Sequence, residues 1–286
     1  MKNYALPLKG LSISILKHCR NRKIHPKNTS RADCYPVYVK HFICKSRAFT
    51  PMKTCLTVFA KQPIPNRVKT RLIPPLSPEQ AATLYTAFLI DWCEALAELA
   101  DVDIVIAYTP PEAQPDLQTL IGDDATYIPQ IGDDLGERLT SATQWAAEHG
   151  YTKILIVGSD SPTLPILYVS EAITRLNTQD VVIGPSVDGG YYLIGFAVEN
   201  LTTIVPLVFS EVAWSTADVL QQTITRIQSA EATLGLLPPW YDIDNAEDLA
   251  FLHAHISAQR LAGDRVQAVR TESILAELFN KKKGIQ

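Results

Sequence analysis

The stretch ILIVGSDSPTLP, residues 154–165, sets a short run of apolar, strand-forming residues directly against a polar turn. A run of this length that ends at Gly158 is typical of a strand buried in the middle of a sheet. In α/β proteins, ligands lie beyond the carboxyl ends of such strands. Asp160 is therefore either a ligand-binding carboxylate or, with Ser161 and Pro162, the start of the next helix.

Strand and helix patterns alternate on both sides of this stretch. Strands are also expected at 55–60, 102–109, 126–130, 180–185, 191–198 and 232–237. Helices are expected at 77–100, 111–121, 135–150, 165–177, 215–229 and 245–261. Because such alternation requires crossover connections, the sequence predicts an α/β fold with a mostly parallel central sheet flanked by helices.

Length and composition predict one catalytic domain at 54–261, followed by a C-terminal helical tail at 262–286. The chain has 286 residues, of which 47% are hydrophobic, and this is enough for one large core. Charges interrupt every apolar stretch well before the roughly 18 residues of a membrane span, so none is expected.

The first 53 residues differ from the rest in charge. They hold 12 Lys and Arg against a single acid, whereas the remainder holds 14 cations against 29 acids. A body this acidic argues against a nucleic-acid partner, whose backbone requires neutralisation by cations. Met52 lies just before the first strand, so we expect it to be the native start and residues 1–51 to be dispensable; an organelle transit peptide is the alternative.

The five cysteines contain no C-x-x-C pair. An odd number without metal-site spacing predicts reduced, unpaired thiols and a cytoplasmic protein.

A basic loop, KQPIPNRVKTRL at 61–72, follows the first strand. It holds Lys61, Arg67, Lys69 and Arg71 and no acid. Arg binds phosphate oxygens in a bidentate manner and Lys supplies a point charge, so this loop suits a polyphosphate. It has neither P-loop nor dinucleotide-fold glycine spacing, and a solvated basic loop is an equally weighted alternative.

Two carboxylates are candidates for a divalent metal, either Mg²⁺ or Mn²⁺. Asp160 would bind it together with the phosphates of the ligand, because Mg²⁺ typically takes one or two carboxylates and completes its shell with phosphate and water. Asp242, in PPWYDIDNAEDLAFL at 238–252, is the natural second ligand. Asp244 and Asn245 are expected instead to cap the helix that follows.

Two glycine-containing turns complete the candidate site. Asp188-Gly189-Gly190 is either a tight turn or a place where the backbone approaches a ligand closely. Asp134 and Gly136 either begin a helix or contact a nucleotide base.

Six motifs occur together along the chain: FAKQPIPNRVKTRL, GDDLGERL, GSDSPTLP, DGGYYLIGF, WST at 214–216 and WYDIDNAEDL. In order and spacing they resemble a bacterial family of glycosyltransferases of the arsenosugar-biosynthesis type. That family is similar to the GT-A nucleotide-diphospho-sugar transferase superfamily, which also includes nucleotidyltransferases. The resemblance covers about residues 54–255. Asn66 replaces the usual Gly, and Asn is the residue that most readily does so at positive φ.

The resemblance implies a single-domain GT-A fold in which Asp160 binds metal and nucleotide, the basic loop binds phosphates, and Asp242 is the distal metal ligand. Ser159, Gly189 and Gly190 join the candidate nucleotide-binding residues. The expected reaction transfers a sugar from a nucleotide-diphosphate sugar to a small-molecule acceptor, with Asp188 or Glu211 as the base if configuration inverts. Nucleotidyl transfer from an NTP, which releases pyrophosphate, is the alternative, and a non-catalytic nucleotide-binding protein is the third possibility.

Overall fold

The structure is a computed structural model that describes residues 53–283. The expectations for residues 1–52, including Met52 as the native start, lie outside the described residues.

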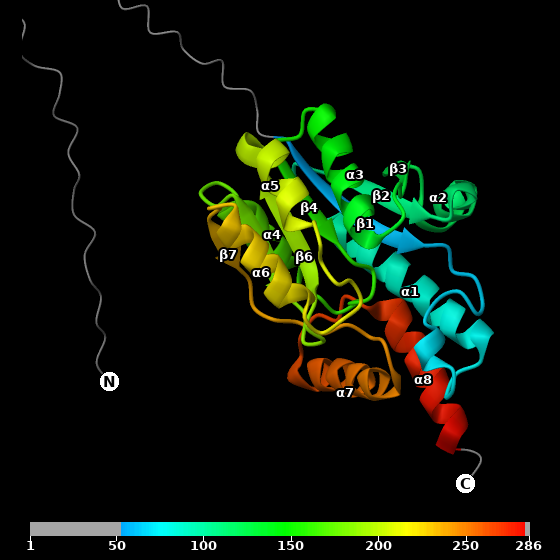
Figure 1. Ribbon diagram of the computed structural model, residues 1–286. Helices are drawn as coiled ribbons and strands as arrows, with labels where there is room; N and C mark the ends of the chain where they lie inside the picture. Colours follow the sequence, from blue (N-terminus) through cyan, green and yellow to red (C-terminus); the bar gives the residue numbers. More distant parts are fainter. Residues whose placement is uncertain (1–52, 284–286) are drawn as a thin grey trace, which may run out of the picture. The chain divides into compact units, whose positions relative to one another are not determined.

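Seven strands form one central sheet (Figure 1). They are β1 (Thr54–Lys61), β2 (Val102–Thr109), β3 (Thr126–Pro129), β4 (Lys153–Val157), β5 (Val181–Pro185), β6 (Tyr191–Ala197) and β7 (Leu234–Leu236). Their order is β3-β2-β1-β4-β6-β5-β7, and only β6 runs antiparallel to its neighbours. The predicted mostly parallel α/β sheet is confirmed.

Helices cover both faces of the sheet, because each strand presents alternate apolar side chains to each face. One face packs on α1 (Pro78–Leu96), α2 (Gln114–Ile121), α4 (Ile166–Arg175), α7 (Ala246–Ala262) and α8 (Val269–Lys283). The other packs on α3 (Leu135–Glu148), α5 (Leu201–Val208) and α6 (Val219–Ser229). The sequence patterns did not predict α5.

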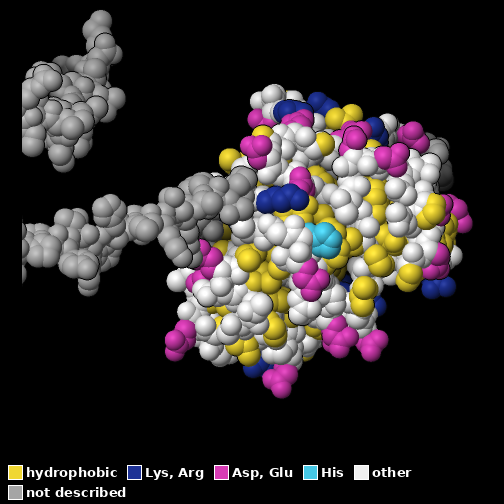
Figure 2. Space-filling model, turned by 90° about the horizontal axis from the view of Figure 1, so that it is seen from above, with side chains coloured by type: hydrophobic (Ala, Val, Ile, Leu, Met, Phe, Trp, Pro, Cys, Tyr) yellow, Lys and Arg dark blue, Asp and Glu magenta, His cyan; other side chains and the backbone are white. Residues whose placement is uncertain are grey.

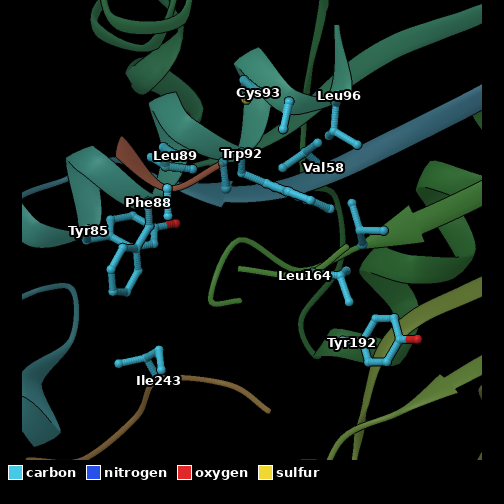
Figure 3. Close-up of a cluster of buried hydrophobic side chains, with 14 of the residues drawn as sticks. Val58, Tyr85, Phe88, Leu89, Trp92, Cys93, Leu96, Leu164, Tyr192 and Ile243 are labelled. Atoms are coloured by element: carbon cyan, nitrogen blue, oxygen red, sulfur yellow. The ribbon is translucent and has the colours of Figure 1, made fainter. Parts of the chain in front are cut away.

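Helix α1 supplies the largest side chains of the core. Phe88, Trp92 and Leu96 are almost completely buried and share one cluster with Val58 on the central strand β1 (Figure 3). Ile243, from the segment after β7, enters the same cluster. This packing ties the loops at the carboxyl ends of the strands to the core.

Local capping signals place two helix starts as expected. Ser77 and Gln80 form a capping box at α1, and Asn245 and Asp248 form one at α7. The helix expected at 165–177 is confirmed as α4, whereas the alternative in which it starts at Asp160 or Ser161 is wrong. The N-cap of α4 is Pro165, so residues 158–165 form a loop whose polar side chains bond to distant parts of the chain.

The C-terminal helix α8 packs along α1 (Figure 1). Asp91 on α1, only 2% exposed, accepts hydrogen bonds from the backbone N–H groups of Arg270 (3.0 Å) and Thr271 (2.8 Å) at the start of α8. A carboxylate at this position satisfies free donors and complements the helix dipole. This contact makes α8 part of the core packing.

Figure 2 shows one face of the molecule, where acidic side chains are spread among apolar and neutral ones and cations are few. Within the described residues, no helix combines the length and apolarity needed to cross a membrane. Cys55 and Cys93 are buried and unpaired, as expected of reduced thiols.

Candidate functional site

Three segments distant in sequence meet at the carboxyl edge of the sheet. They are the basic loop after β1, the loop at 158–165 after β4, and residues 238–245 after β7. The third extends alongside β5 through a bridge between Ser186 and Trp240. It then reaches the second, where the N–H of Ile243 donates to the carbonyl of Asp160 at 3.0 Å.

Lys69 joins the basic loop to the other two segments. Its ammonium lies 2.7 Å from Oδ1 of Asp160 and 3.2 Å from Oδ1 of Asp244, and it donates to the carbonyl of Ile243 at 2.6 Å. The Lys69 side chain is 5% exposed, whereas the Asp160 and Asp244 side chains are 44% and 38% exposed. The cation is therefore buried beneath two partly solvated carboxylates.

Electrostatics keep Lys69 charged despite its burial. Loss of solvent by itself lowers the pKa of a buried ammonium, but the charges of Asp160 and Asp244 outweigh this effect and hold the pKa of Lys69 above its ordinary value. The contact with Asp244 corrects one expectation: Asn245 caps α7, while the Asp244 carboxylate pairs with Lys69.

Asp242 has a different environment from Asp244, although both lie on one extended segment. Its Oδ1 accepts a hydrogen bond from the hydroxyl of Ser161 and its Oδ2 accepts one from Ser186 at 2.7 Å. Burial raises the pKa of Asp242 to about 6; the two serines lower it, while the charges of Asp160 and Asp188 raise it. Asp242 thus joins the loops after β4 and β5.

The two carboxylates expected to share a divalent metal have other partners in this structure. Both oxygens of Asp242 are bonded to hydroxyls, and the cation beside Asp160 is Lys69. Over residues 53–283, no three His, Cys, Asp or Glu side chains converge on one point, so protein side chains alone do not form a metal site here. A metal on Asp160 would need further oxygens from a bound ligand or water.

Ser159 belongs to the scaffold beneath the site. Its buried hydroxyl donates to the carbonyl of Phe59 at 2.9 Å and lies 2.8 Å from the hydroxyl of Tyr85, which also accepts from the N–H of Lys61 at 3.0 Å. Burial raises the pKa of Tyr85, so this phenol stays neutral. The network holds β1, β4 and α1 together directly under the basic loop.

The remaining predicted phosphate-binding cations lie on the surface of the basic loop. Lys61, Arg67 and Arg71 are exposed, in contrast to Lys69. The loop passes through left-handed backbone at Asn66 (φ 63°) and Lys69 (φ 47°). The positive φ expected for Asn66 is confirmed.

Residues 209–218, which we call the strap, cover Gly136 in the first turn of α3 and Gly189 in the turn after β5. A side chain at Gly136 would come within 2.8 Å of the Trp214 indole nitrogen, and one at Gly189 would come within 2.2 Å of the Ala217 carbonyl oxygen. Asp134 caps α3 by accepting from the N–H of Glu137 at 2.9 Å. Both glycines are thus required for close packing against the strap.

The two candidate bases differ in their partners. Asp188 is exposed and its Oδ1 accepts from the N–H of Gly190 at 2.9 Å, within the turn between β5 and β6. The expected tight turn at Asp188-Gly189-Gly190 is therefore present, with Gly189 at φ 94°. Glu211, whose side chain is 80% exposed, pairs with Arg226 of α6 at 2.7 Å.

Sequence reasoning did not find the hydrogen-bonded chain beside Asp242. The Tyr241 hydroxyl lies 2.8 Å from that of Thr163 and 2.6 Å from Nδ1 of His255 on α7. Burial lowers the pKa of His255, which favours the neutral ring. His255 is thus packed against Tyr241, and the adjacent aromatic residues Trp240 and Tyr241 before Asp242 were the available signal in the sequence.

Comparison with known proteins finds similar solved structures, a similar curated protein and a family model. A solved structure described as a "putative nucleotide-diphospho-sugar transferase" from Desulfovibrio desulfuricans G20 is 35% identical and covers 79% of this chain and 95% of its own, with a TM-score of 0.71. The 2-phospho-L-lactate guanylyltransferase of Methanothermobacter thermautotrophicus is 31% identical over 142 residues, 49% of this chain. The chain spans only 60% of the length of that relative.

The family match lies in the centre of the domain. A family model described as "Uncharacterized protein conserved in bacteria (DUF2064)" matches residues 92–216. This range includes the loop at 158–165, the turn at Asp188 and the WST segment. Together with the 35% identity over almost the whole of the solved relative, it shows that the chain belongs to the DUF2064 family.

Proposed function

We propose that this chain is a transferase that binds a nucleotide through the basic loop and moves a group from it to a small molecule. The leading reaction is glycosyl transfer from a nucleotide-diphosphate sugar. The observation that carries the proposal is the contact of Lys69 with Asp160, which attaches a loop of four cations to the carboxyl end of β4. The similarity to a solved protein described as a nucleotide-diphospho-sugar transferase supports it.

The exposed cations of the loop bind the diphosphate and stabilise its charge as it leaves. Arg67 and Arg71 provide bidentate donors and Lys61 a point charge, so they favour the state in which negative charge develops on the leaving group. Asp134 and Gly136, beside the strap, are proposed to lie at the nucleotide base. The arsenosugar-biosynthesis type and a cytoplasmic location stay predictions.

In the inverting form of the reaction, an acceptor hydroxyl attacks the anomeric carbon, the bond to the diphosphate breaks, and a carboxylate takes the hydroxyl proton. We assign this role to Asp188. Asp188 is exposed, and only its Oδ1 is bonded within the turn, so Oδ2 is available to take a proton. The turn is held at the site because Ser186, two residues earlier, bonds to Asp242. The ion pair of Glu211 with Arg226 makes Glu211 the weaker candidate.

Nucleotidyl transfer is the second candidate, and the similarity to a guanylyltransferase favours it. A phosphate oxygen of the substrate would attack the α-phosphate of an NTP, and pyrophosphate would leave. The same cations serve both reactions, so only the products distinguish them.

The test is a panel of NTPs and nucleotide sugars, each incubated with small hydroxylated and phosphorylated acceptors. Release of nucleoside diphosphate supports glycosyl transfer, whereas release of pyrophosphate supports the second candidate. Arg71→Gln should weaken the reaction, and Arg265→Gln, an exposed cation paired with Glu98, is the matched control. Nucleotide binding without any product would support a non-catalytic binding protein and refute the proposal.

A further inference from the structure

The environment of Lys69 has the form of a filled cation site. An ammonium has three hydrogens to donate, and here three oxygens receive them: Asp160 Oδ1 at 2.7 Å, the Ile243 carbonyl at 2.6 Å and Asp244 Oδ1 at 3.2 Å. The Phe88 ring adds a cation–π contact at 5.9 Å from the nitrogen. The charge of Lys69 is therefore fully partnered.

The backbone of Lys69 shows that the surroundings hold this arrangement. Lys69 adopts a left-handed conformation, with φ 47° and ψ 38°, immediately before the 3₁₀ helix η1 (Thr70–Leu72). A non-glycine residue in this region is strained, and it persists only where other contacts stabilise it. The contacts with Asp160, Ile243 and Asp244 provide that stabilisation, because they fix the end of the Lys69 side chain. Ile243 and Asp244 lie 174 and 175 residues after Lys69 in the sequence, so the tertiary fold holds this conformation.

We propose that Lys69 is the resident cation of this site and competes with divalent metal for Asp160 while no polyphosphate is bound. Carboxylate and carbonyl oxygens are the ligands of hard divalent cations, so such an ion would need the same oxygens that Lys69 occupies. Two cations repel each other at contact distance, and the ammonium must leave before the ion can enter.

A polyphosphate is the ligand that can move Lys69. Its oxygens offer the ammonium a replacement for the two carboxylates, and Arg67 and Arg71 on the same loop attract it. This step rests on the proposed function, whereas the competition of Lys69 with metal depends only on the contacts described above. The chain should therefore bind a divalent cation more weakly before the phosphates than after them.

The experiment measures Mn²⁺ binding to the full chain without nucleotide, by electron paramagnetic resonance. Lys69→Met keeps the length of the side chain and removes its charge, and it should bind Mn²⁺ at least roughly tenfold more tightly than the wild type, which corresponds to about 1.4 kcal/mol. Lys61→Met is the matched control, because it removes one charge from the same loop but has no contact with Asp160. Equal affinity of Lys69→Met and wild type, or an equal gain in Lys61→Met, would overturn the proposal.

A second measurement uses the wild-type chain, so that it does not depend on the folding of a variant. Mn²⁺ is added in steps, and the labelling of each lysine by an amine-reactive ester is followed by mass spectrometry. We expect labelling of Lys69 to rise as Mn²⁺ binds, while labelling of Lys61 stays constant. Bound Mn²⁺ with Lys69 still protected would overturn the proposal. Neither measurement requires turnover, so failure of the proposed transfer reaction would leave these results interpretable.

Discussion

Asp242→Asn should make the protein more stable, relative to wild type, as the pH rises. Burial raises the pKa of this carboxyl from 3.8 to about 6 in the folded chain, and the unfolded chain restores the ordinary value. The folded state therefore holds the proton more tightly, and ionisation costs stability. A pKa difference of this size corresponds to about 3 kcal/mol.

The pH range follows from these two pKa values. Well below pH 4 the carboxyl is protonated in both states and ionisation costs nothing; the cost grows as the pH rises from 4 to 6 and reaches about 3 kcal/mol by pH 8. Asn keeps the shape of the side chain and cannot ionise. Its altered hydrogen bonds with Ser161 and Ser186 add an offset that is the same at every pH.

The assay is urea unfolding of both proteins in EDTA from pH 4 to pH 8. The free energy of unfolding of Asp242→Asn minus that of wild type should rise by about 2–3 kcal/mol over this range, with most of the rise below pH 6. The hydroxyl of Ser186 lowers the pKa of Asp242, so Ser186→Ala should raise that pKa further. When the same comparison is made in the Ser186→Ala background, the rise should therefore continue to higher pH. A constant difference across the range, or one that falls with pH, would refute the reasoning.

Two further substitutions test how the body of the domain is held together. Asp91→Asn leaves one of two backbone N–H groups of α8 with a neutral acceptor and the other with none, and it should lower the free energy of unfolding by about 2–3 kcal/mol. Hydrogen exchange should be faster in α8; unchanged protection there would contradict this role. Gly189→Ala should cost at least about 3 kcal/mol, because the added methyl meets a backbone oxygen 2.2 Å away, whereas Gly150→Ala, at φ 82° with open space around it, should cost only about 1 kcal/mol. If Gly189→Ala and Gly150→Ala lower the free energy of unfolding equally in denaturant titrations, the clash is ruled out.

Features that depend on a few neighbouring residues were predictable. The apolar run before Gly158 became β4, the capping boxes at Ser77 and Asn245 began their helices, and Asn66 took a positive φ. Each is set by side-chain alternation, a local hydrogen bond or a local backbone preference, so the sequence around it contains the cause. The parallel sheet followed in turn from the alternation of strands and helices.

The site required contacts between residues far apart in the chain. The position of Asp160 at the carboxyl end of a buried strand, and the basic loop after β1, could be predicted from the residues around them. The bonds of Lys69 to Asp160 and Asp244, and of Asp242 to two serines, appear only in the folded chain. A carboxylate binds whichever donor the packed core brings within about 3 Å, and no local pattern records which distant donor that is.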